Sequence, residues 1–326
     1  MRHIPAFDWN KTRTFFTFIN SLKYFFLEKP DIIISATWQN AVGLLPLRKI
    51  IDFQLITFAH GRDIAIINSM NIEKCYNVFK NNTVTFAVSN FLKSMIESKI
   101  NNIPKNTIKV LANGADSILF YSKDISSSFY NDFNINQNSL LILSVGRMIE
   151  LKEYETIIKS ISILDTKKID VKLIIISPFK LDSKYYLALK NLIKELDLEE
   201  KVNIIGSQSP ETLSNFYSMA NLYVQSTGRD KSNNQEEGLS MTVIEAQFCG
   251  APVVVTRSGG MPDAVAPGLG QIIEIGDADS LAKIITDVAN EPKKYNEIGI
   301  KSAEYMRENF SWEIIVNKFL AHIGEK

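Results

Sequence analysis

The sequence predicts an α/β protein built from two Rossmann-like domains, and three observations support this fold class. Short apolar runs, each bounded by polar or turn residues, are typical of buried parallel strands. Segments with helical spacing of apolar residues alternate with these runs, which indicates strands joined by helical crossovers. The polar stretch Ser122–Asn138 has no clear period and separates two such alternations, so we interpret it as an interdomain linker.

These patterns place the expected elements along the chain. The expected strands are Asp31–Ser35, Gln54–Ala59, Thr83–Val88, Thr107–Ala112, Leu140–Val145, Lys172–Ser177, Lys201–Ile205, Ala220–Gln225 and Pro252–Thr256. Clear helical spacing is found in Tyr154–Leu164, Tyr185–Leu196, Glu211–Met219 and Met241–Cys249. The domains are therefore expected to span residues 1–135 and 136–326, with ligands bound at strand carboxyl ends in the cleft between them.

Composition limits the classes of function. The 326 residues are enough for two domains with separate cores, and a formal net charge of zero argues against a strongly basic nucleic-acid binder. Cys75 and Cys249 match no metal-binding spacing, so we interpret them as buried thiols in a reducing compartment. No apolar run reaches the roughly 20 residues needed to cross a bilayer.

The N-terminal region contains an aromatic stretch, Phe15–Phe26, whose apolar residues recur with helical spacing. Asn20 and Lys23 interrupt it and no small-residue cleavage site is present, so it does not resemble a secretory signal. Two alternatives stay open. We favour a helix that packs on the core over a helix that lies on a membrane surface.

The most informative segment, EGLSMTVIEAQFCGAPVVVTRSGG, begins at Glu237 and carries Glu245 after seven intervening residues. Gly238 allows the backbone to approach a ligand closely, and a helix beginning near Ser240 would offer free N–H groups to a phosphate. Glu245, about one turn into that helix, could accept hydrogen bonds from the vicinal hydroxyls of a ribose. The Gly259–Gly260 turn could form another phosphate-facing loop. The alternative for either glutamate alone is a solvated helix charge.

Two further clusters follow expected strands. Arg147 and Lys152 come after Gly146, and two cations at a strand's carboxyl end suit a diphosphate, although a surface salt-bridge pair is the plainer alternative. His60 stands just past another strand, beside Gly61, where it could contact a donor sugar or be merely structural.

Five motifs in order resemble the large family 4 of retaining glycosyltransferases, which have the GT-B fold. The motifs are VSNFLKSMI, LANGADSILF, SVGRMIELK, NIIGSQSPETLSNFYSMANLYVQS and the segment from Glu237 with its double glycine. The resemblance runs from about Lys29 to about Trp312, and NNQEEGLSMTVIEAQFCGAPVV is most similar to bacterial transferases that build capsule, exopolysaccharide or lipopolysaccharide. It implies two Rossmann-like domains facing across a cleft, with the last helix, about 311–326, packing back on the N-terminal domain.

The resemblance implies roles for individual residues. Arg147 and Lys152, after the Gly146 turn, match the pair that grips the donor diphosphate, and Glu245 matches the carboxylate that holds the nucleotide ribose. Glu237 matches the carboxylate near the transferred sugar.

The remaining matches lie around that sugar and in the N-terminal domain. The amides of Gly238 and Leu239 are expected beside the sugar, and His60 matches a histidine often placed against it. Asn113 and Gly114 match a turn at the inner end of the N-terminal domain.

The chain also departs from the family pattern. Glu153 replaces the glycine that usually follows the lysine, and the acidic residue after the double glycine is Asp263. The family's first strand, glycine-rich loop and next two strand–helix units have no counterpart before Lys29, so we expect a shortened N-terminal domain. For the chain as given, this predicts weak activity and a tendency to self-associate or to bind a membrane.

The resemblance predicts transfer of a sugar, with retention of configuration, from a UDP- or GDP-sugar to a glycan or lipid-linked acceptor. No metal or other cofactor is expected; Asp277-Ala278-Asp279 looks like a metal motif, but Asp277 is better interpreted as a helix N-cap. The expected location is the cytoplasm, at the inner face of the cell membrane. One alternative is a catalytically weak or inactive sugar-nucleotide-binding subunit; an epimerase or a phosphorylase on the same fold is less favoured.

Overall fold

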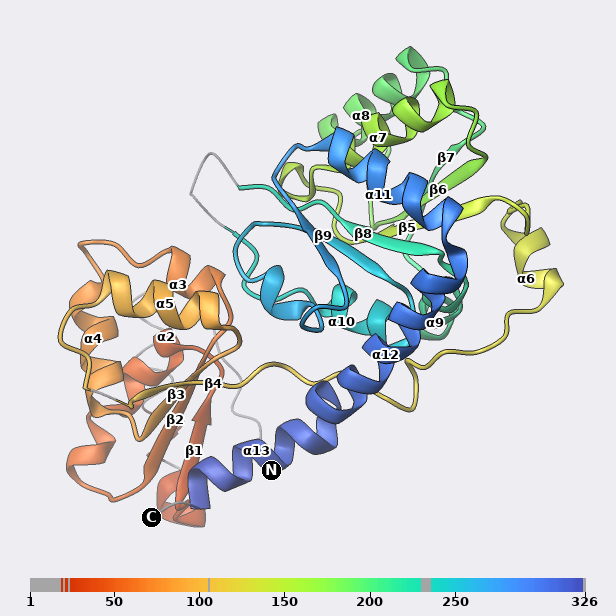
Figure 1. Ribbon diagram of the computed structural model, residues 1–326. Coiled ribbons are helices and arrows are strands. Elements are labelled where there is room, and N and C mark those ends of the chain that lie inside the picture. Colours follow the sequence, from red (N-terminus) through yellow and green to blue (C-terminus); the bar gives the residue numbers. More distant parts are fainter. Residues whose placement is uncertain (1–18, 20, 23, 105, 230–235, 325–326) are drawn as a thin grey trace. The chain divides into compact units, whose positions relative to one another are not determined.

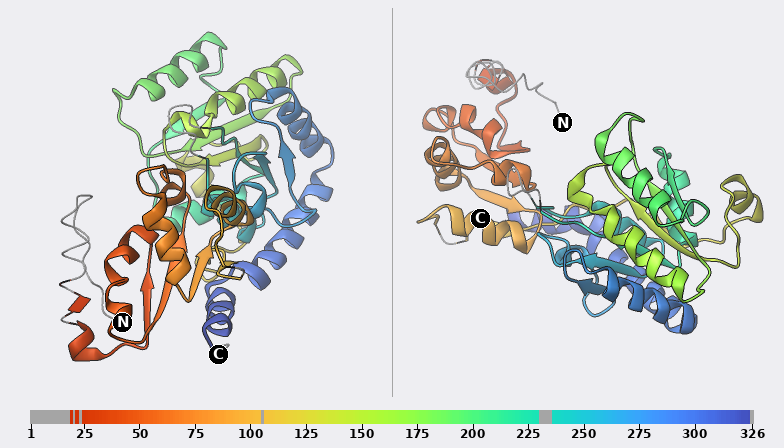
Figure 2. Two further views of the ribbon diagram at one scale, coloured as in Figure 1. Left: turned by 90° about the vertical axis from the view of Figure 1, so that its left-hand side faces the viewer. Right: turned by 90° about the horizontal axis from the view of Figure 1, so that it is seen from above.

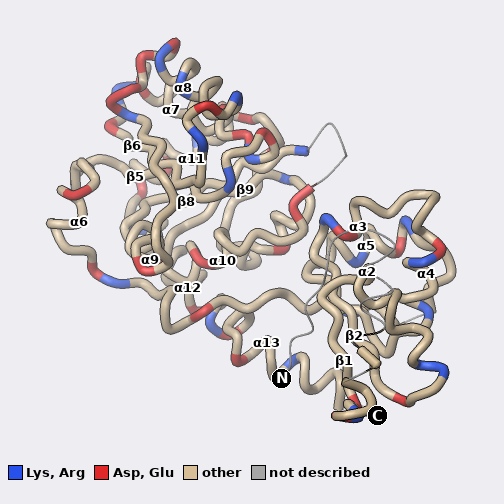
Figure 3. The backbone as a smooth tube through the Cα atoms, turned by 180° about the vertical axis from the view of Figure 1, so that it is seen from behind, with Lys and Arg blue, Asp and Glu red and all other residues tan. Residues whose placement is uncertain are grey.

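The computed structural model of the chain describes residues 19, 21–22, 24–104, 106–229 and 236–324. The chain divides into two compact units, residues 1–112 and 113–326 (Figure 1). Each unit is α/β and contains one parallel sheet, as the alternating pattern predicts. Figure 3 shows positive and negative residues interspersed over both units, in keeping with the net charge of zero.

The first unit is built on a four-stranded sheet in the order β1-β2-β3-β4. The strands are β1 (Ile32–Ser35), β2 (Gln54–Ala59), β3 (Val84–Ala87) and β4 (Ile108–Val110). The helices are α2 (Trp38–Ala41), α3 (Arg62–Ala65), α4 (Ile72–Asn81) and α5 (Asn90–Lys99), with 3-10 turns η1 (Val42–Leu44) and η2 (Leu47–Lys49). All four predicted strands of this half are therefore present; β2 has the predicted bounds, and the other three are one to three residues shorter.

The aromatic stretch Phe15–Phe26 lies partly outside the described residues, and those of its residues that are described are helical. Phe25 is buried, and its ring lies 4.9 Å from that of Phe53. Phe26 and Leu27 are exposed. The described part thus packs on the core through one face, which supports the favoured alternative.

The second unit is built on a six-stranded sheet in the order β10-β9-β8-β5-β6-β7. The strands are β5 (Leu140–Val145), β6 (Val171–Ile176), β7 (Val202–Ile205), β8 (Leu222–Gln225), β9 (Val253–Thr256) and β10 (Gln271–Ile273). Strand β10 was not predicted, because it has three residues, begins with glutamine and buries only Ile273. The chain runs outward from β5 to β7 and then crosses to β8, so the strand order reverses between β5 and β8. Ligands bind at such switch points in open parallel sheets.

Helices cover both faces of this sheet (Figures 1 and 2). One layer contains α7 (Tyr154–Thr166), α8 (Lys184–Glu195) and α11 (Ala278–Asn290), which share a core with β5, β6 and β8. The other contains α9 (Pro210–Met219), α10 (Met241–Phe248) and α12 (Pro292–Phe310). The remaining elements are α6 (Ser127–Asp132), η3 (Glu150–Lys152), η4 (Pro262–Ala264) and α13 (Trp312–Gly324). Among the described helices, none is both long and apolar enough to cross a membrane.

The segment 113–135 belongs with the second unit, whereas the sequence places the domain boundary after it. The Ala115 amide donates to the Phe310 carbonyl, and the Ser214 hydroxyl donates to the Leu119 carbonyl. Phe129, in α6, packs edge-on against Phe216. The predicted linker is therefore partly helical and anchored, because the half-buried rings of Phe129 and Phe133 pack against Phe216 of α9. The packing of the last helix on the first unit stays a prediction.

Candidate active site

The turn after β5 carries the first cluster of predicted residues. A Cβ atom at Gly146 would lie 3.0 Å from the Tyr154 hydroxyl and 3.4 Å from Cε of Lys152, so glycine permits close packing there. The Ser226 hydroxyl, just past β8, donates to the carbonyls of Lys152 and Glu153 at 3.1 and 2.9 Å. These bonds tie the Lys152 turn to the end of β8, across the switch point.

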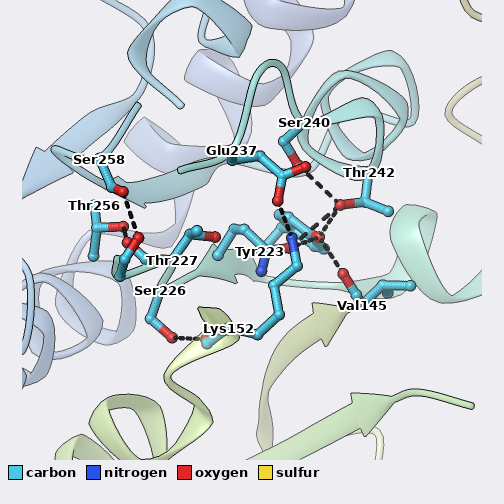
Figure 4. Close-up of polar contacts among 12 residues, drawn as sticks. Val145, Lys152, Tyr223, Ser226, Thr227, Glu237, Ser240, Thr242, Thr256 and Ser258 are labelled. Carbon is cyan, nitrogen blue, oxygen red and sulfur yellow. Dashed lines mark hydrogen bonds and ion pairs between the residues drawn. The ribbon is translucent and has the colours of Figure 1, made fainter. Parts of the chain in front are cut away.

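Lys152 and Glu237, two residues predicted separately, form an ion pair (Figure 4). Nζ of Lys152 lies 2.7 Å from Oε2 of Glu237, and the side chains are 7% and 22% exposed. The Gly260 amide donates to the Glu237 carbonyl at 2.8 Å, and Gly259 has φ +51°, where a Cβ atom would overlap that carbonyl oxygen. The double glycine therefore holds the backbone of Glu237 in place through direct contacts with its carbonyl group.

The Tyr223 hydroxyl lies at the centre of a polar network that the sequence analysis missed (Figure 4). It is 3.2 Å from the Val145 carbonyl, 2.9 Å from Oε1 of Gln225 and 2.8 Å from Oγ1 of Thr242. One fully buried side chain thus joins the ends of β5 and β8 to the first turn of α10. The signal was available as tyrosine and glutamine alternating within the otherwise apolar strand LYVQ.

The loop between β8 and α10 is fastened at its entry. The hydroxyl of Thr256 donates to the Thr227 carbonyl at 2.5 Å, and that of Ser258 donates to the Gly228 carbonyl at 2.7 Å. Both donors stand at or just past the end of β9 (Figure 4). The polar residues at the end of β9 therefore hold the segment that follows β8.

Glu245 lies on α10, as predicted, and is half-buried. The Tyr217 hydroxyl of α9 donates to Oε2 of Glu245 at 3.1 Å. Burial raises the pKa of Glu245, and this hydrogen bond opposes the rise. The carboxylate is thus held in one orientation with Oε1 available to a second partner.

Helix α10 begins after Ser240, whose side chain makes no capping hydrogen bond. The first N–H groups of a helix have no intrahelical acceptor and carry the positive end of its dipole. Gly238 and Leu239 are buried immediately before this helix start. The arrangement offers donors to an anion beside the Lys152–Glu237 pair.

Arg147 is exposed on the turn that follows β5, and it has no ion-pair partner among the described residues. The structure therefore places it next to Gly146, as predicted, without joining it to Glu237. Its positive charge is close enough to Tyr154 to lower that hydroxyl's pKa, although burial raises the pKa overall.

His60 follows β2 in the first unit and is exposed, with its ring stacked on Phe58 at a centroid distance of 6.0 Å. Oδ1 of Asp63 accepts hydrogen bonds from the amides of His60 and Gly61, both at 2.9 Å. Gly61 has φ +125°, a conformation open to glycine. Asp63 thus shapes the turn that presents His60, a role that was not predicted from the sequence.

Other predicted residues have structural settings. Glu153 adopts the left-handed conformation, with φ +42° and ψ +45°, where a glycine is favoured. Asp277 caps α11 by accepting from the Ser280 amide at 2.9 Å, which confirms the N-cap interpretation. Gly114, predicted in an N-terminal-domain turn, instead packs against Trp312 within the second unit. Asp263 lies in η4. Within the described residues no cluster of His, Cys, Asp and Glu could hold a metal ion.

Residues 128–305 match the family model described as "Glycosyl transferases group 1", so the chain belongs to this family. The chain is 21% identical over 274 residues to N-acetyl-alpha-D-glucosaminyl L-malate synthase of Bacillus anthracis, covering 82% of this chain and 66% of the relative. It is 28% identical over 243 residues to the capsular polysaccharide biosynthesis glycosyltransferase CapM of Staphylococcus aureus, covering 72% of this chain and 59% of the relative. The chain thus spans less than two thirds of the length of either curated relative.

Among solved structures, Anabaena Alr3699/HepE in complex with UDP matches with a TM-score of 0.81 at 18% identity. The match covers 97% of this chain and 82% of that one. The predicted family and the GT-B fold class are confirmed. The arrangement of the two domains across a cleft and the role of each site residue stay predictions.

Proposed function

We propose that the chain transfers a sugar from a nucleoside-diphosphate sugar to a glycan or lipid-linked acceptor, with retention of configuration, in the synthesis of a cell-surface polysaccharide. The observation that carries the proposal is the Lys152–Glu237 pair beside the uncapped start of α10, at the strand-order reversal of the matched domain. The role of CapM in capsular polysaccharide biosynthesis and the UDP bound to Alr3699/HepE agree with this substrate class.

Each group at the switch point has a task in this proposal. Lys152 and the exposed Arg147 neutralise the charge that develops on the departing diphosphate, assisted by the N–H groups at the start of α10. Glu245, held by Tyr217, accepts hydrogen bonds from the ribose hydroxyls. Glu237 and the amides of Gly238 and Leu239 face the transferred sugar.

The remaining parts of the proposal concern the sugar, the cation requirement and the location. His60 contacts the donor sugar through its exposed ring. The two cations and the helix start supply the electrostatic stabilisation of the leaving group, so the reaction proceeds without a metal ion. The donor is a UDP- or GDP-sugar, and the protein works in the cytoplasm at the inner face of the membrane, where lipid-linked acceptors are found.

Calorimetry and a transfer assay test the proposal together. The chain is titrated with UDP, GDP and, as a control, ADP, and is then incubated with radiolabelled UDP- and GDP-sugars and membrane-extracted acceptors, with and without EDTA. We expect selective binding of one nucleoside diphosphate and EDTA-resistant transfer, with the anomeric configuration of the product, read by NMR, matching that of the donor. Binding without transfer would favour the sugar-nucleotide-binding subunit, and no binding would refute the assignment of the site.

A further inference from the structure

The Lys152 ammonium is a buried cation with one counter-charge. Its side chain is 7% exposed, and Glu237 is its sole ion-pair partner within the described residues. A buried charge without an opposite charge is strongly disfavoured, because protein groups must replace the water it has lost. Glu237 therefore supplies Lys152 with the counter-charge that an anion could also supply.

The backbones of the two residues are held independently of their ion pair. The Ser226 hydroxyl fixes the Lys152 carbonyl at 3.1 Å, and the Gly260 amide fixes the Glu237 carbonyl at 2.8 Å. The two side chains approach each other from opposite sides of the site (Figure 4). The pair can consequently open by rotation of side chains alone, with both backbone anchors intact.

A diphosphate and Glu237 compete for the same ammonium. The Lys152 ammonium is a compact charge that suits phosphate oxygens, as the proposed function requires. A diphosphate bound there would stand against the carboxylate of Glu237, and like charges at this separation repel strongly in a partly buried site. Both anions cannot keep a full contact with Lys152.

We propose that the Lys152–Glu237 pair is a resting state that the donor diphosphate breaks, so that Glu237 is released toward the sugar as the donor binds. Departure of the nucleoside diphosphate restores the pair, which favours product release. The exchange breaks no covalent bond and moves no proton. It rests on the proposed function, because it assumes that a nucleoside diphosphate occupies Lys152.

The exchange predicts effects of opposite sign on binding and on transfer. Glu237→Gln removes the competing charge, so it should bind the free nucleoside diphosphate on the order of tenfold more tightly, within the usual range of coupling between sites. The same variant should transfer sugar more slowly, because it has no carboxylate at position 237 to face the sugar and because the nucleoside diphosphate dissociates more slowly. A residue that only supported the fold would weaken both.

Glu236→Gln is the matched control. Glu236 is adjacent in the chain and pairs with the exposed Arg229 at 2.6 Å, so the variant removes the same charge without touching Lys152. It should change nucleotide affinity by less than about twofold, as expected for a pair that faces solvent on one side. In a Lys152→Gln background, Glu237→Gln should give no tightening, because the ammonium for which the two anions compete is gone.

Calorimetric titration of these variants with UDP and GDP decides the matter, with thermal unfolding as a second measurement. The expected result is tighter binding by Glu237→Gln alone, a lower melting temperature without nucleotide and a larger rise on adding it. Equal or weaker binding by Glu237→Gln, or equal tightening by Glu236→Gln, would overturn the exchange while leaving the proposed function standing. If the wild-type chain binds neither nucleotide, the proposed function fails and the exchange fails with it. If Glu237→Gln does not fold, Glu237→Asp replaces it. The shorter side chain should weaken the ion pair and tighten nucleotide binding by a smaller factor, and unchanged binding would count against the exchange.

Discussion

The two units each present a predicted site residue just past the carboxyl end of a parallel strand, but they hold it by different means. In the first unit, Asp63 fixes the His60 turn through two backbone amides. In the second unit, Lys152 is placed by a network in which Ser226 and Tyr223 connect the ends of neighbouring strands. The first turn depends on a single carboxylate, whereas the second depends on many contacts.

His60 of the first unit and Lys152 of the second also differ in their exposure to solvent. His60 is exposed and stacks on Phe58, so the protein constrains it little beyond its backbone. Lys152 is buried and paired, so its surroundings must compensate a charge. The first unit therefore fixes only the backbone position of His60, whereas the second unit fixes both the backbone of Lys152 and its ammonium nitrogen. Substitutions can separate these two kinds of control.

The largest effect is expected when the charge at the second turn is removed. Lys152→Ala and Arg147→Ala should each lower turnover, and the double variant should lose on the order of a hundredfold or more, because preorganised charges supply most of the leaving-group stabilisation. Stability should fall only for Lys152→Ala, since Arg147 is exposed and has no ion-pair partner in the described part of the chain. Steady-state kinetics and chemical denaturation measure both. Full activity of the double variant would show that the diphosphate assignment is wrong.

The next effect concerns the ribose carboxylate and the tyrosine that holds it. Glu245→Ala should weaken binding of free nucleoside diphosphate by about 1.5–3 kcal/mol, the usual value of a hydrogen bond to a charged group. Tyr217→Phe removes the hydrogen bond that opposes the raised pKa of Glu245, so that pKa should rise further. Binding requires the ionised carboxylate and is lost as pH falls through this pKa. In Tyr217→Phe the loss should therefore begin at a higher pH than in the wild type.

Calorimetry between about pH 5 and pH 8 measures this shift, with Tyr217→Phe compared with a second hydroxyl deletion, Tyr186→Phe. Tyr186 lies on α8, where its ring stacks on Phe179, away from Glu245 in the fold. An identical pH profile for the wild type and Tyr217→Phe would remove the proposed role of Tyr217.

These residues also show how far the sequence leads. The order of strands and helices could be predicted because burial imposes simple periods on apolar residues. Glu237 and Lys152 could be nominated singly, because Glu237 immediately precedes a glycine and Lys152 follows a strand and a glycine. Their ion pair joins positions 85 residues apart, and no local pattern records it. Tyr217 could not be chosen either, because a buried tyrosine in a helix looks like ordinary core until the partner of its hydroxyl is known.

At the His60 turn, substitution of Asp63 alone should lower the free energy of unfolding, because this residue makes both hydrogen bonds to the backbone of the turn. Asp63→Ala leaves one buried and one part-buried amide without an acceptor, so the free energy of unfolding should fall by about 2 kcal/mol. Asp63→Asn retains an oxygen acceptor and should recover much of this loss. Activity should fall with Asp63→Ala, and in a His60→Ala background the further loss should disappear if Asp63 acts through the histidine.

The same residue gives the turn a pH dependence. Burial raises the pKa of Asp63 despite its two amide bonds, so ionising this group costs folding free energy. That cost is absent below the unfolded pKa near 4 and grows as pH rises through the higher folded pKa. The stability of Asp63→Asn relative to the wild type should therefore increase from about pH 4 upward and then level off. Urea denaturation across this range measures it, and a flat difference would contradict the assigned cause.

The smallest effect separates the backbones of the two turns. The His60 turn places glycine at its positive φ, whereas the Lys152 turn places Glu153 there, at φ +42°. A left-handed conformation costs a non-glycine residue about 1 kcal/mol. The Glu153 side chain packs so closely on Gly228 that a Cβ atom at 228 would overlap its carboxylate. Glu153→Gly therefore relieves strain and removes a negative charge beside Lys152. It also loses the contact with Gly228 and increases the conformational entropy of the unfolded chain, and both of these effects lower stability.

Three substitutions at this position distinguish strain from charge. Glu153→Gln keeps the strain and removes the charge. Glu153→Asn removes the charge and reduces the strain, because asparagine tolerates the left-handed region, and Glu153→Gly removes both. If strain dominates, stability should rise by up to about 1 kcal/mol in Gly and Asn but not in Gln. If the charge also opposes the diphosphate, all three should bind nucleoside diphosphate a few times more tightly, because an exposed or half-buried charge acts weakly on its neighbours. Denaturation and calorimetry on the same set give both answers. Unchanged affinity for nucleoside diphosphate in all three variants would mean that the charge of Glu153 does not oppose binding. The Lys152 turn, unlike the His60 turn, would then not require glycine at its left-handed position.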